Sequence, residues 1–422
     1  RPSSLQRIFH HLQLSGNKGL ISGHMQATVD SAPWRLAGAN GQLSVNGTQV
    51  HLGPALPTLT VSNLQVASSP DQGLQIAKSE LSWDEHHFLV DGHFQPHPFG
   101  PTDLDVTIAT PSLSWSWLNS HVSQLATWFE KDRARSGPWP VQGKINIRME
   151  QFRYRKRTFA PLHLTWKMTP DGPLTVHILE HSRLCGISVP GKVSIQPDKL
   201  QFTVAPSSSG LDLAPTLKCL LQSQNTATGT LDLRGHVQAA APAAEDLSSH
   251  LDGELNFTVT DGRLLRFSLL AKLVEVLNST EILFGSLPDL ENEGIRFSSL
   301  QGTARMHGER IVIDKGLVDG HSLEMGFQGH LDIQDKTLDL TVLVAPLKTV
   351  DRLVKKIPII SGLTRGNLIT IPVRISGPWT DPKVIPLSPQ AVSKELVDLM
   401  RRALEWPFQI LQPFMSPDNE KE

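Results

Sequence analysis

The sequence predicts a mostly β protein: an elongated, twisted and largely antiparallel β-sheet that curls into an open groove, with a few amphipathic helices including one at the C-terminus. Short runs of alternating apolar and polar residues recur along the chain, which is the period of strands with one apolar and one solvated face. The 422 residues include 31 Gly and 30 Pro, and this turn-rich composition suits many short strands better than a helical bundle. A degenerate repeat of a glycine followed by an alternating strand also recurs, and such repeats stack sideways into elongated sheets.

The first predicted segment, residues 1–138, is a β-repeat part of the groove that ends in a helix. Its alternating runs are separated by Gly, Pro and Asn and predict strands of a meander. Four residues at helical spacing then predict the helix, which the Gly137-Pro138 pair would end. These four are Leu118, Val122, Leu125 and Phe129.

Residues 139–250 form a second predicted segment, a further β region that carries the two cysteines of the chain, Cys185 and Cys219. The pattern from Gly210 to Gln222 predicts a short helix on which Cys219 would lie. Two interpretations of the cysteines stay open at this point: one disulfide, or two buried free thiols. A disulfide that closes a loop of about 35 residues would stabilise the fold by about 4 kcal/mol in the chain-entropy model.

The third segment, residues 251–387, holds most of the regular patterning, and we expect a sheet with helices laid against it. Helical patterns run from Arg263 to Asn278 and from Lys348 to about Ile360. Between and after them, three alternating runs predict strands with an apolar face, which either lines an open trough or forms a dry core. The apolar positions are Leu323, Met325, Phe327, Leu331, Ile333, Leu338, Leu340, Val342, Val344, Ile369, Ile371, Val373 and Ile375.

The last segment, residues 388–416, predicts an amphipathic helix followed by an apolar tail. Ser388 as N-cap and Pro389 at the first position are a good helix start. Because an exposed apolar stripe of this size is uncommon on a soluble monomer, we expect it to be covered, either by the protein itself, where it could close the groove as a lid, or by a membrane. The balanced charges of its polar face favour docking on the protein. The stripe consists of Val392, Leu396, Leu399, Ala403 and Leu404.

Three stretches of the third segment carry a family resemblance: 261–273, beginning DGRLLRF, 342–358, beginning VLVAPLK, and 371–384, beginning IPVRISGPWTDP. Together they resemble the C-terminal region of the AsmA-like family, the AsmA, YhdP and TamB type of β-groove envelope protein, over about residues 185–413. The resemblance implies a Gram-negative protein of the periplasm, anchored in the inner membrane. It also implies that the chain binds or conducts phospholipid between the inner and outer membranes, and an envelope setting favours the Cys185–Cys219 disulfide.

Several further expectations follow from this resemblance. The apolar strand positions of the third segment would line the lipid path, and the partners would be phospholipid and the two membranes or their proteins. The alternative is a scaffold or assembly factor for outer-membrane proteins, in which an exposed sheet edge pairs with client strands. Since no run approaches the 18 or so apolar residues of a membrane span, we expect the anchor to lie upstream of residue 1.

Charge and motifs argue against other classes of function. Thirty-nine Lys and Arg against 41 Asp and Glu leave a formal charge of -2, so no nucleic-acid partner is expected. The run from Gly186 to Lys192 imitates a phosphate-binding loop, but Val193 stands where a Ser or Thr would hold magnesium, so no nucleotide is expected. The histidines at 86, 87, 93 and 97 lack a third ligand at a diagnostic spacing. The sequence therefore predicts a non-enzymatic protein with no catalytic residue, metal or cofactor.

One basic cluster, Arg148 with Arg153, Arg155, Lys156 and Arg157, has two interpretations. If residues 152–158 form one strand, Arg153, Arg155 and Arg157 share a face and could contact anionic lipid headgroups. A charged edge that discourages aggregation between sheets is the alternative.

Overall fold

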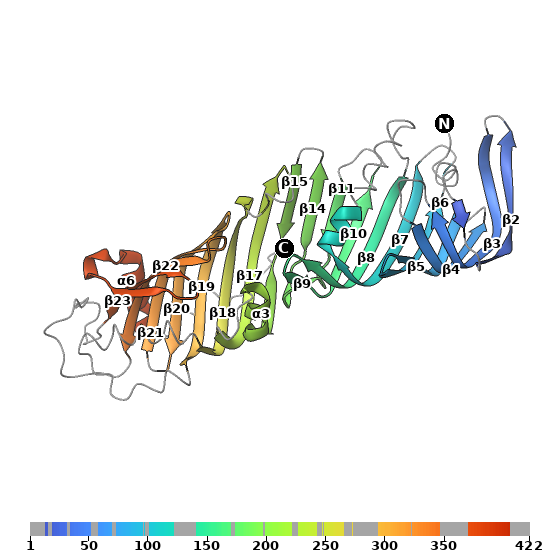
Figure 1. Cartoon of the computed structure of the whole chain (residues 1–422). Helices are drawn as coiled ribbons and strands as arrows, with labels where there is room; N and C mark the ends of the chain where they lie inside the picture. The colour runs from blue at the N-terminus through green and yellow to red at the C-terminus, as the bar shows by residue number, and fades with distance from the viewer. Residues whose placement is uncertain are drawn as a thin grey trace. The chain divides into compact units, whose positions relative to one another are not determined.

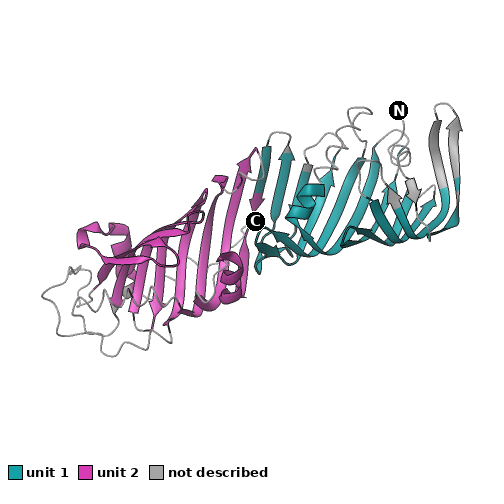
Figure 2. Cartoon of the chain, viewed as in Figure 1, with its two compact units in different colours: residues 1–202 teal, residues 203–422 magenta. Residues whose placement is uncertain are grey.

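The computed structural model divides into two compact units, residues 1–202 and 203–422 (Figure 2). The predicted mostly β fold is confirmed, because strands make up most of the described chain in both units. The structure describes residues 13–15, 19–31, 34–51, 58–69, 73–95, 97, 101–121, 141–169, 174–196, 199–221, 227–242, 247, 249–265, 272, 294–321, 323–346 and 370–405.

Most of the described strand pairs of the first unit are antiparallel. β7 and β8 run parallel, with Val106 opposite Ile145. A parallel pair needs a long crossover connection, usually with a helix, and residues 115–121 directly after β7 are helical. This is the described part of the helix predicted around Leu118; Val122, Leu125 and Phe129 lie outside the described residues. The strands are β1 (Gln13–Ser15), β2 (Leu20–Ser31), β3 (Trp34–His51), β4 (Thr58–Ser69), β5 (Gly73–Trp83), β6 (His86–Gln95), β7 (Thr102–Ser114), β8 (Val141–Tyr154), β9 (Arg157–Phe159), β10 (Leu162–Met168), β11 (Leu174–Ile178), β12 (Arg183–Leu184), β13 (Ile187–Ser188) and β14 (Gly191–Gln196).

The second unit is an antiparallel meander in which each strand from β16 to β24 pairs with the next one along the chain (Figure 1). The division between the units falls within β15 (Lys199–Val204). The elements that follow are β16 (Ser207–Asp212), α3 (Leu213–Leu221), β17 (Ala227–Ala241), β18 (Asp252–Leu264), β19 (Ile295–His307), β20 (Arg310–Gly320), β21 (Leu323–Asp332), β22 (Thr337–Pro346), β23 (Ile371–Pro378), β24 (Lys383–Pro386), η2 (Pro389–Ala391) and α6 (Lys394–Glu405).

The internal helices predicted from the sequence agree with the structure to different degrees. The short helix expected around Cys219 is present as α3. The expected start of the other internal helix was wrong, because Arg263 still belongs to β18, where it pairs with Arg296 of β19. Most of that helical pattern, the whole of 348–360, and the apolar tail after residue 405 lie outside the described residues.

The C-terminal helix is confirmed, but it begins at Lys394 and not at Pro389. Pro389 opens only the single 3₁₀ turn η2, and the side chain of Ser388 makes no capping bond there. Ser393 is the cap of α6, since its Oγ accepts a hydrogen bond from the Leu396 N–H at 3.1 Å. The extended backbone at Val392 separates the short turn from the helix.

Candidate functional site

The strand register of the second unit aligns apolar side chains on one face of β17 to β23. Directly opposed residues of antiparallel neighbours lie on the same face, so the pairings trace continuous rows across the sheet. We call this surface the apolar face and number its rows from one to four. The first row is Leu231, Val259, Leu300, Val318, Met325, Val344 and Ile371; the second is Leu233, Phe257, Gly302, Gly316, Phe327, Val342 and Val373; the third is Gly235, Leu255, Ala304, Ile313, Gly329, Leu340 and Ile375; the fourth is Val237, Gly253, Met306, Ile311, Leu331, Leu338 and Gly377.

The glycines of the second row leave space for neighbouring aromatic rings. A Cβ on Gly316 would lie 2.3 Å from the Phe327 ring, and a Cβ on Gly302 would lie 2.8 Å from Cζ of Phe257. The two rings therefore lie across bare backbone, which flattens this part of the apolar face. Substitution of either glycine by alanine would displace a ring.

Burial of the apolar face falls from the first row to the fourth. Val344 and Ile371 in the first row are 0% and 1% exposed. In the fourth row Met306, Leu331 and Leu338 are only half-buried, although they stand on the same face. Half-buried apolar side chains in adjacent strands form a surface that can accept an apolar ligand.

The predicted groove residues within β21 to β23 fall on this one face but differ in burial. Leu323, Met325, Val342, Val344, Ile371, Val373 and Ile375 are buried. Phe327, Leu331, Leu338 and Leu340 are half-buried, as is Ile333 in the turn after β21. Ile369 lies outside the described residues. Sequence reasoning missed the matching positions of β17 to β20, because only the register joins them into rows.

The opposite surface of the same strands, the polar face, carries paired charges. Arg374 Nε and Nη2 donate to both carboxylate oxygens of Asp339 at 2.8 and 2.6 Å. These hydrogen bonds hold the pKa of the Asp339 carboxyl below its ordinary value. Arg305 makes the same bidentate pair with Asp314, since its Nε donates to Oδ2 at 2.6 Å and its Nη2 donates to Oδ1. Bidentate pairs of this kind belong to a solvated surface.

Helix α6 docks on the polar face, over an apolar area formed by β20 and β22. Leu396, Met400 and Ala403 of the helix pack against Leu317, Leu343 and Ala345 of β20 and β22. Gly326 lies beneath them, with room for a Cβ at 3.4 Å from both Leu396 and Met400. Docking on the protein was the preferred expectation for the described part of the stripe. The idea of a lid across the groove was wrong, because the helix covers the face opposite the apolar rows; Met400, fully buried, was absent from the predicted stripe.

The first unit contains an open cavity of about 1400 Å³ over β2 to β7. Exposed polar side chains line this cavity, together with the residues next to them in each strand. Asp103 at its edge bonds to His97 and Gln142, and these hydrogen bonds lower the pKa of the Asp103 carboxyl. The polar residues along it include His24, Gln42, Gln65, Gln75, Asp91 and His93.

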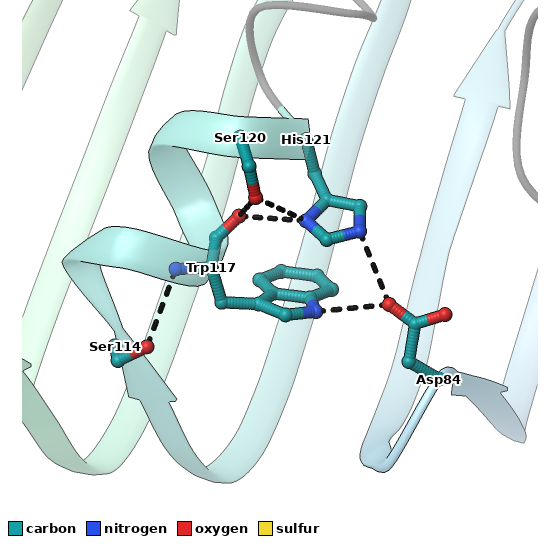
Figure 3. A network of polar contacts seen from close by, with 5 residues as sticks. All are labelled: Asp84, Ser114, Trp117, Ser120 and His121. Atoms are coloured by element: carbon teal, nitrogen blue, oxygen red, sulfur yellow. Dashed lines mark hydrogen bonds and ion pairs between the residues drawn. The ribbon is translucent and has the colours of Figure 1, made fainter.

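A cluster of polar and aromatic residues joins the 115–121 helix to the turn between β5 and β6 (Figure 3). His121 Nε2 lies 3.1 Å from Asp84 Oδ2, and the His121 ring stacks on Trp117 with centroids 4.3 Å apart. Its Nδ1 lies 2.7 Å from the Trp117 carbonyl oxygen, which can only accept, so Nδ1 is the donor. Ser120 donates to the same carbonyl at 2.8 Å. Serine, histidine and aspartate meet here, but the imidazole cannot accept the serine proton in this geometry, and the cluster fastens a helix.

Neither Cys185 nor Cys219 is a free thiol; both are disulfide-bonded. Cys185 occupies the turn between β12 and β13 with a positive φ of 53°, and Cys219 lies on α3. The chain contains no other cysteine.

The basic cluster does not form the single strand that the sequence suggested. β8 ends at Tyr154, residues 155 and 156 form a tight turn, and β9 begins at Arg157. Tyr154 then pairs with Arg157, whereas Arg153 pairs with Thr158 on the other face of the hairpin. The shared face for Arg153, Arg155 and Arg157 was therefore wrong, because a left-handed turn residue, Arg155 with φ of 53°, reverses the chain between them.

Three further features that the sequence led us not to expect are a metal site, a phosphate-binding loop and a membrane-spanning helix. Within the ranges that the structure describes, no group of three or more His, Cys, Asp or Glu side chains could hold a metal ion. Gly191 opens strand β14, where a phosphate-binding loop would need a helix. Among the helices described, none has the length and apolarity to cross a membrane.

No model of a known protein family matches the chain, and no curated protein or solved structure shows significant similarity to it.

Proposed function

We propose that the chain is an AsmA-like envelope protein that binds or conducts phospholipid along the apolar face of its β-sheet. The observation that carries the proposal is the register of β17 to β23, which aligns apolar residues of seven strands on one face. We place the acyl chains on the half-buried apolar side chains of the third and fourth rows, which are Leu255, Leu340, Met306, Ile311, Leu331 and Leu338. The family resemblance adds the envelope setting, with phospholipid and the two membranes as partners.

The physical support is the cost of moving a lipid through water. Exposure of an acyl chain costs about 0.8 kcal/mol per CH₂, which is about 12 kcal/mol for sixteen carbons. Rows that cross seven strands without a charged side chain would offset most of this cost at each step along the sheet. Such a path needs no catalytic group, so the protein is proposed to be non-enzymatic, in the periplasm and anchored in the inner membrane.

Site-specific photo-crosslinking in living cells tests the lipid path. A crosslinker at Leu331 or Leu338, in the half-buried fourth row, should trap phospholipid. A matched crosslinker at Thr303, half-buried on the polar face, should trap none. Buried Val342 is a weaker reporter because its side chain is only 4% exposed. Equal trapping on the two faces, or no lipid at either, would refute a one-sided path.

A scaffold for outer-membrane proteins is the alternative class of function. Native mass spectrometry after gentle purification separates the two, because a lipid carrier retains phospholipid and a scaffold retains a β-barrel client. Recovery of a client without lipid would overturn the lipid proposal.

A further inference from the structure

The open cavity over β2 to β7 is a feature of the first unit that the lipid proposal does not use. Its volume of about 1400 Å³ exceeds the range of about 300–1,000 Å³ that is usual for drug-sized ligands. We call it the polar hollow. One row of opposed residues crosses five strands along it: His24, Gln42, Ala67, Gln75 and His93. At the spacing of neighbouring strands this row is about 19 Å long, so the polar hollow accommodates an extended ligand.

The side chains of the polar hollow are rich in neutral hydrogen-bonding groups. Four of the residues that line it are glutamines. Gln42 and Gln65 are exposed, and their side-chain amides have no hydrogen-bond partner among the described residues. Each amide can both donate and accept. Ala67 stands between Gln42 and Gln75 in the row, and its short side chain leaves room for a ligand that bonds to amides on both sides.

The charge of the polar hollow disfavours anionic ligands. Its described lining contains two carboxylates, Asp91 and Asp103, and no lysine or arginine. Hydrogen bonds to His97 and Gln142 lower the pKa of the Asp103 carboxyl, which keeps it ionised at neutral pH. A carboxylate accepts strong hydrogen bonds from hydroxyl groups, but it repels phosphates and other carboxylates. The lining therefore suits a ligand that is uncharged and rich in hydroxyl groups.

Apolar ligands are better matched by the other face of the same strands. The residues between the polar positions turn their side chains to that face, because side chains alternate along a strand. They form a row of their own: Gly23, Leu43, Val66, Ile76, Gly92 and Val106. An acyl chain in the polar hollow would instead cover amides and carboxylates without bonding to them, which is costly.

We propose that the polar hollow is a binding site for a neutral oligosaccharide. The hydroxyl groups of the sugar donate to the carboxylate of Asp91 and exchange hydrogen bonds with the amides of Gln42 and Gln65. An extended peptide is less suitable, because its backbone groups pair with the edge of a sheet and the polar hollow presents side chains on a face. Oligosaccharide binding here does not rest on the movement of lipid along the apolar face.

Isothermal titration of the full chain with three neutral hexasaccharides, maltohexaose, mannohexaose and chitohexaose, tests the polar hollow. At least one should bind to the wild type. The variant Gln42→Met/Gln65→Met keeps the length of both side chains but removes their amides, so it should bind that sugar at least about tenfold more weakly, at about threefold or more for each amide. Because the ligand is uncharged, added salt should leave the affinity unchanged.

The matched control is Gln49→Met/Gln151→Met, which makes the same change at two exposed strand positions of the first unit that do not line the polar hollow. It should bind like the wild type. Failure of all three sugars to bind, or equal affinities of the two double variants, would overturn the proposal. Tighter binding of hexagalacturonate or of a neutral hexapeptide would overturn it as well.

A second variant keeps the test decisive if Gln42→Met/Gln65→Met fails to fold. Asp91→Asn replaces a charged acceptor with a neutral one at an exposed position, and it should weaken sugar binding about fivefold. An unchanged affinity would contradict the assigned role of Asp91. Lipid crosslinking at Leu338 is a separate measurement: its failure refutes the lipid path alone, and failure of sugar binding refutes the polar hollow alone.

Discussion

The two faces of the second unit are built from the same strands but are covered in different ways. On the polar face an apolar area around Leu317 and Leu343 is covered by α6. On the apolar face the side chains form four rows, of which one edge is buried and the other is half-buried. The comparison teaches that amphipathic patterning alone does not reveal where a helix docks. The helix docks where its own apolar stripe matches the area available, and that area lies on the face that is otherwise polar.

The largest effect that would test this comparison comes from the helix contact. Met400 of α6 is fully buried against the sheet, so Met400→Ala should lower the free energy of opening the helix by about 2–5 kcal/mol. Amide hydrogen exchange over residues 394–405 measures it. Arg402→Ala, at an exposed position of the same helix, should change this energy by less than about 0.5 kcal/mol. If both variants exchange like the wild type, the helix is not held by this contact.

The next prediction sharpens the contrast within the apolar face. Ile371→Ala, at a side chain 1% exposed, should destabilise the surrounding strands by about 2–5 kcal/mol. Leu338→Ala, in the half-buried fourth row, should cost only about 1 kcal/mol and should reduce the amount of co-purified lipid. Urea unfolding and lipid extraction report the two quantities. Equal destabilisation by both changes would mean that the fourth row is core and not a binding surface.

The smallest effect concerns Glu324, a half-buried carboxylate on the polar face, in register with Ala345 of the α6 contact. Its Oε2 is buried and finds no hydrogen-bond partner among the described residues. Burial, and then the charge of Asp319, raise the pKa of Glu324 above its ordinary 4.5. The folded state therefore binds the proton more tightly than the unfolded state. The free energy of unfolding falls as pH rises from the pKa of Glu324 in the unfolded chain through its raised pKa in the folded protein, and it stays lower at higher pH.

Glu324→Gln should accordingly unfold at a higher urea concentration than the wild type at neutral pH, and the difference should vanish below about pH 4. Asp335→Asn, an equal change of charge at an exposed turn, is the control and should show no such pH-dependent gain. A gain that persists in acid, or appears equally in the control, would exclude ionisation of Glu324 as the cause.

Much of the local structure could be predicted from particular residues. The alternation from Leu323 to Ile333 predicted β21 and its apolar side, and the stripe from Leu396 to Ala403 predicted α6. These predictions succeeded because the strand period of two and the helix period of 3.6 are properties of the backbone and depend only on neighbouring residues. The prediction failed at Arg155 because a run of cations contains no local signal that a non-glycine residue will adopt a left-handed turn.

The sequence by itself determined which side chains of each strand are apolar, that many strands repeat, and that the chain ends in an amphipathic helix. Only the tertiary structure decided that Leu231 and Ile371 belong to one row, that β7 and β8 run parallel, and that α6 covers the polar face. The physical reason is that register and docking are set by partners distant in the chain. A slip of one residue in the register of any strand would move its apolar side chains to the other face of the sheet. The sequence of one strand does not specify the neighbouring strand that prevents this slip.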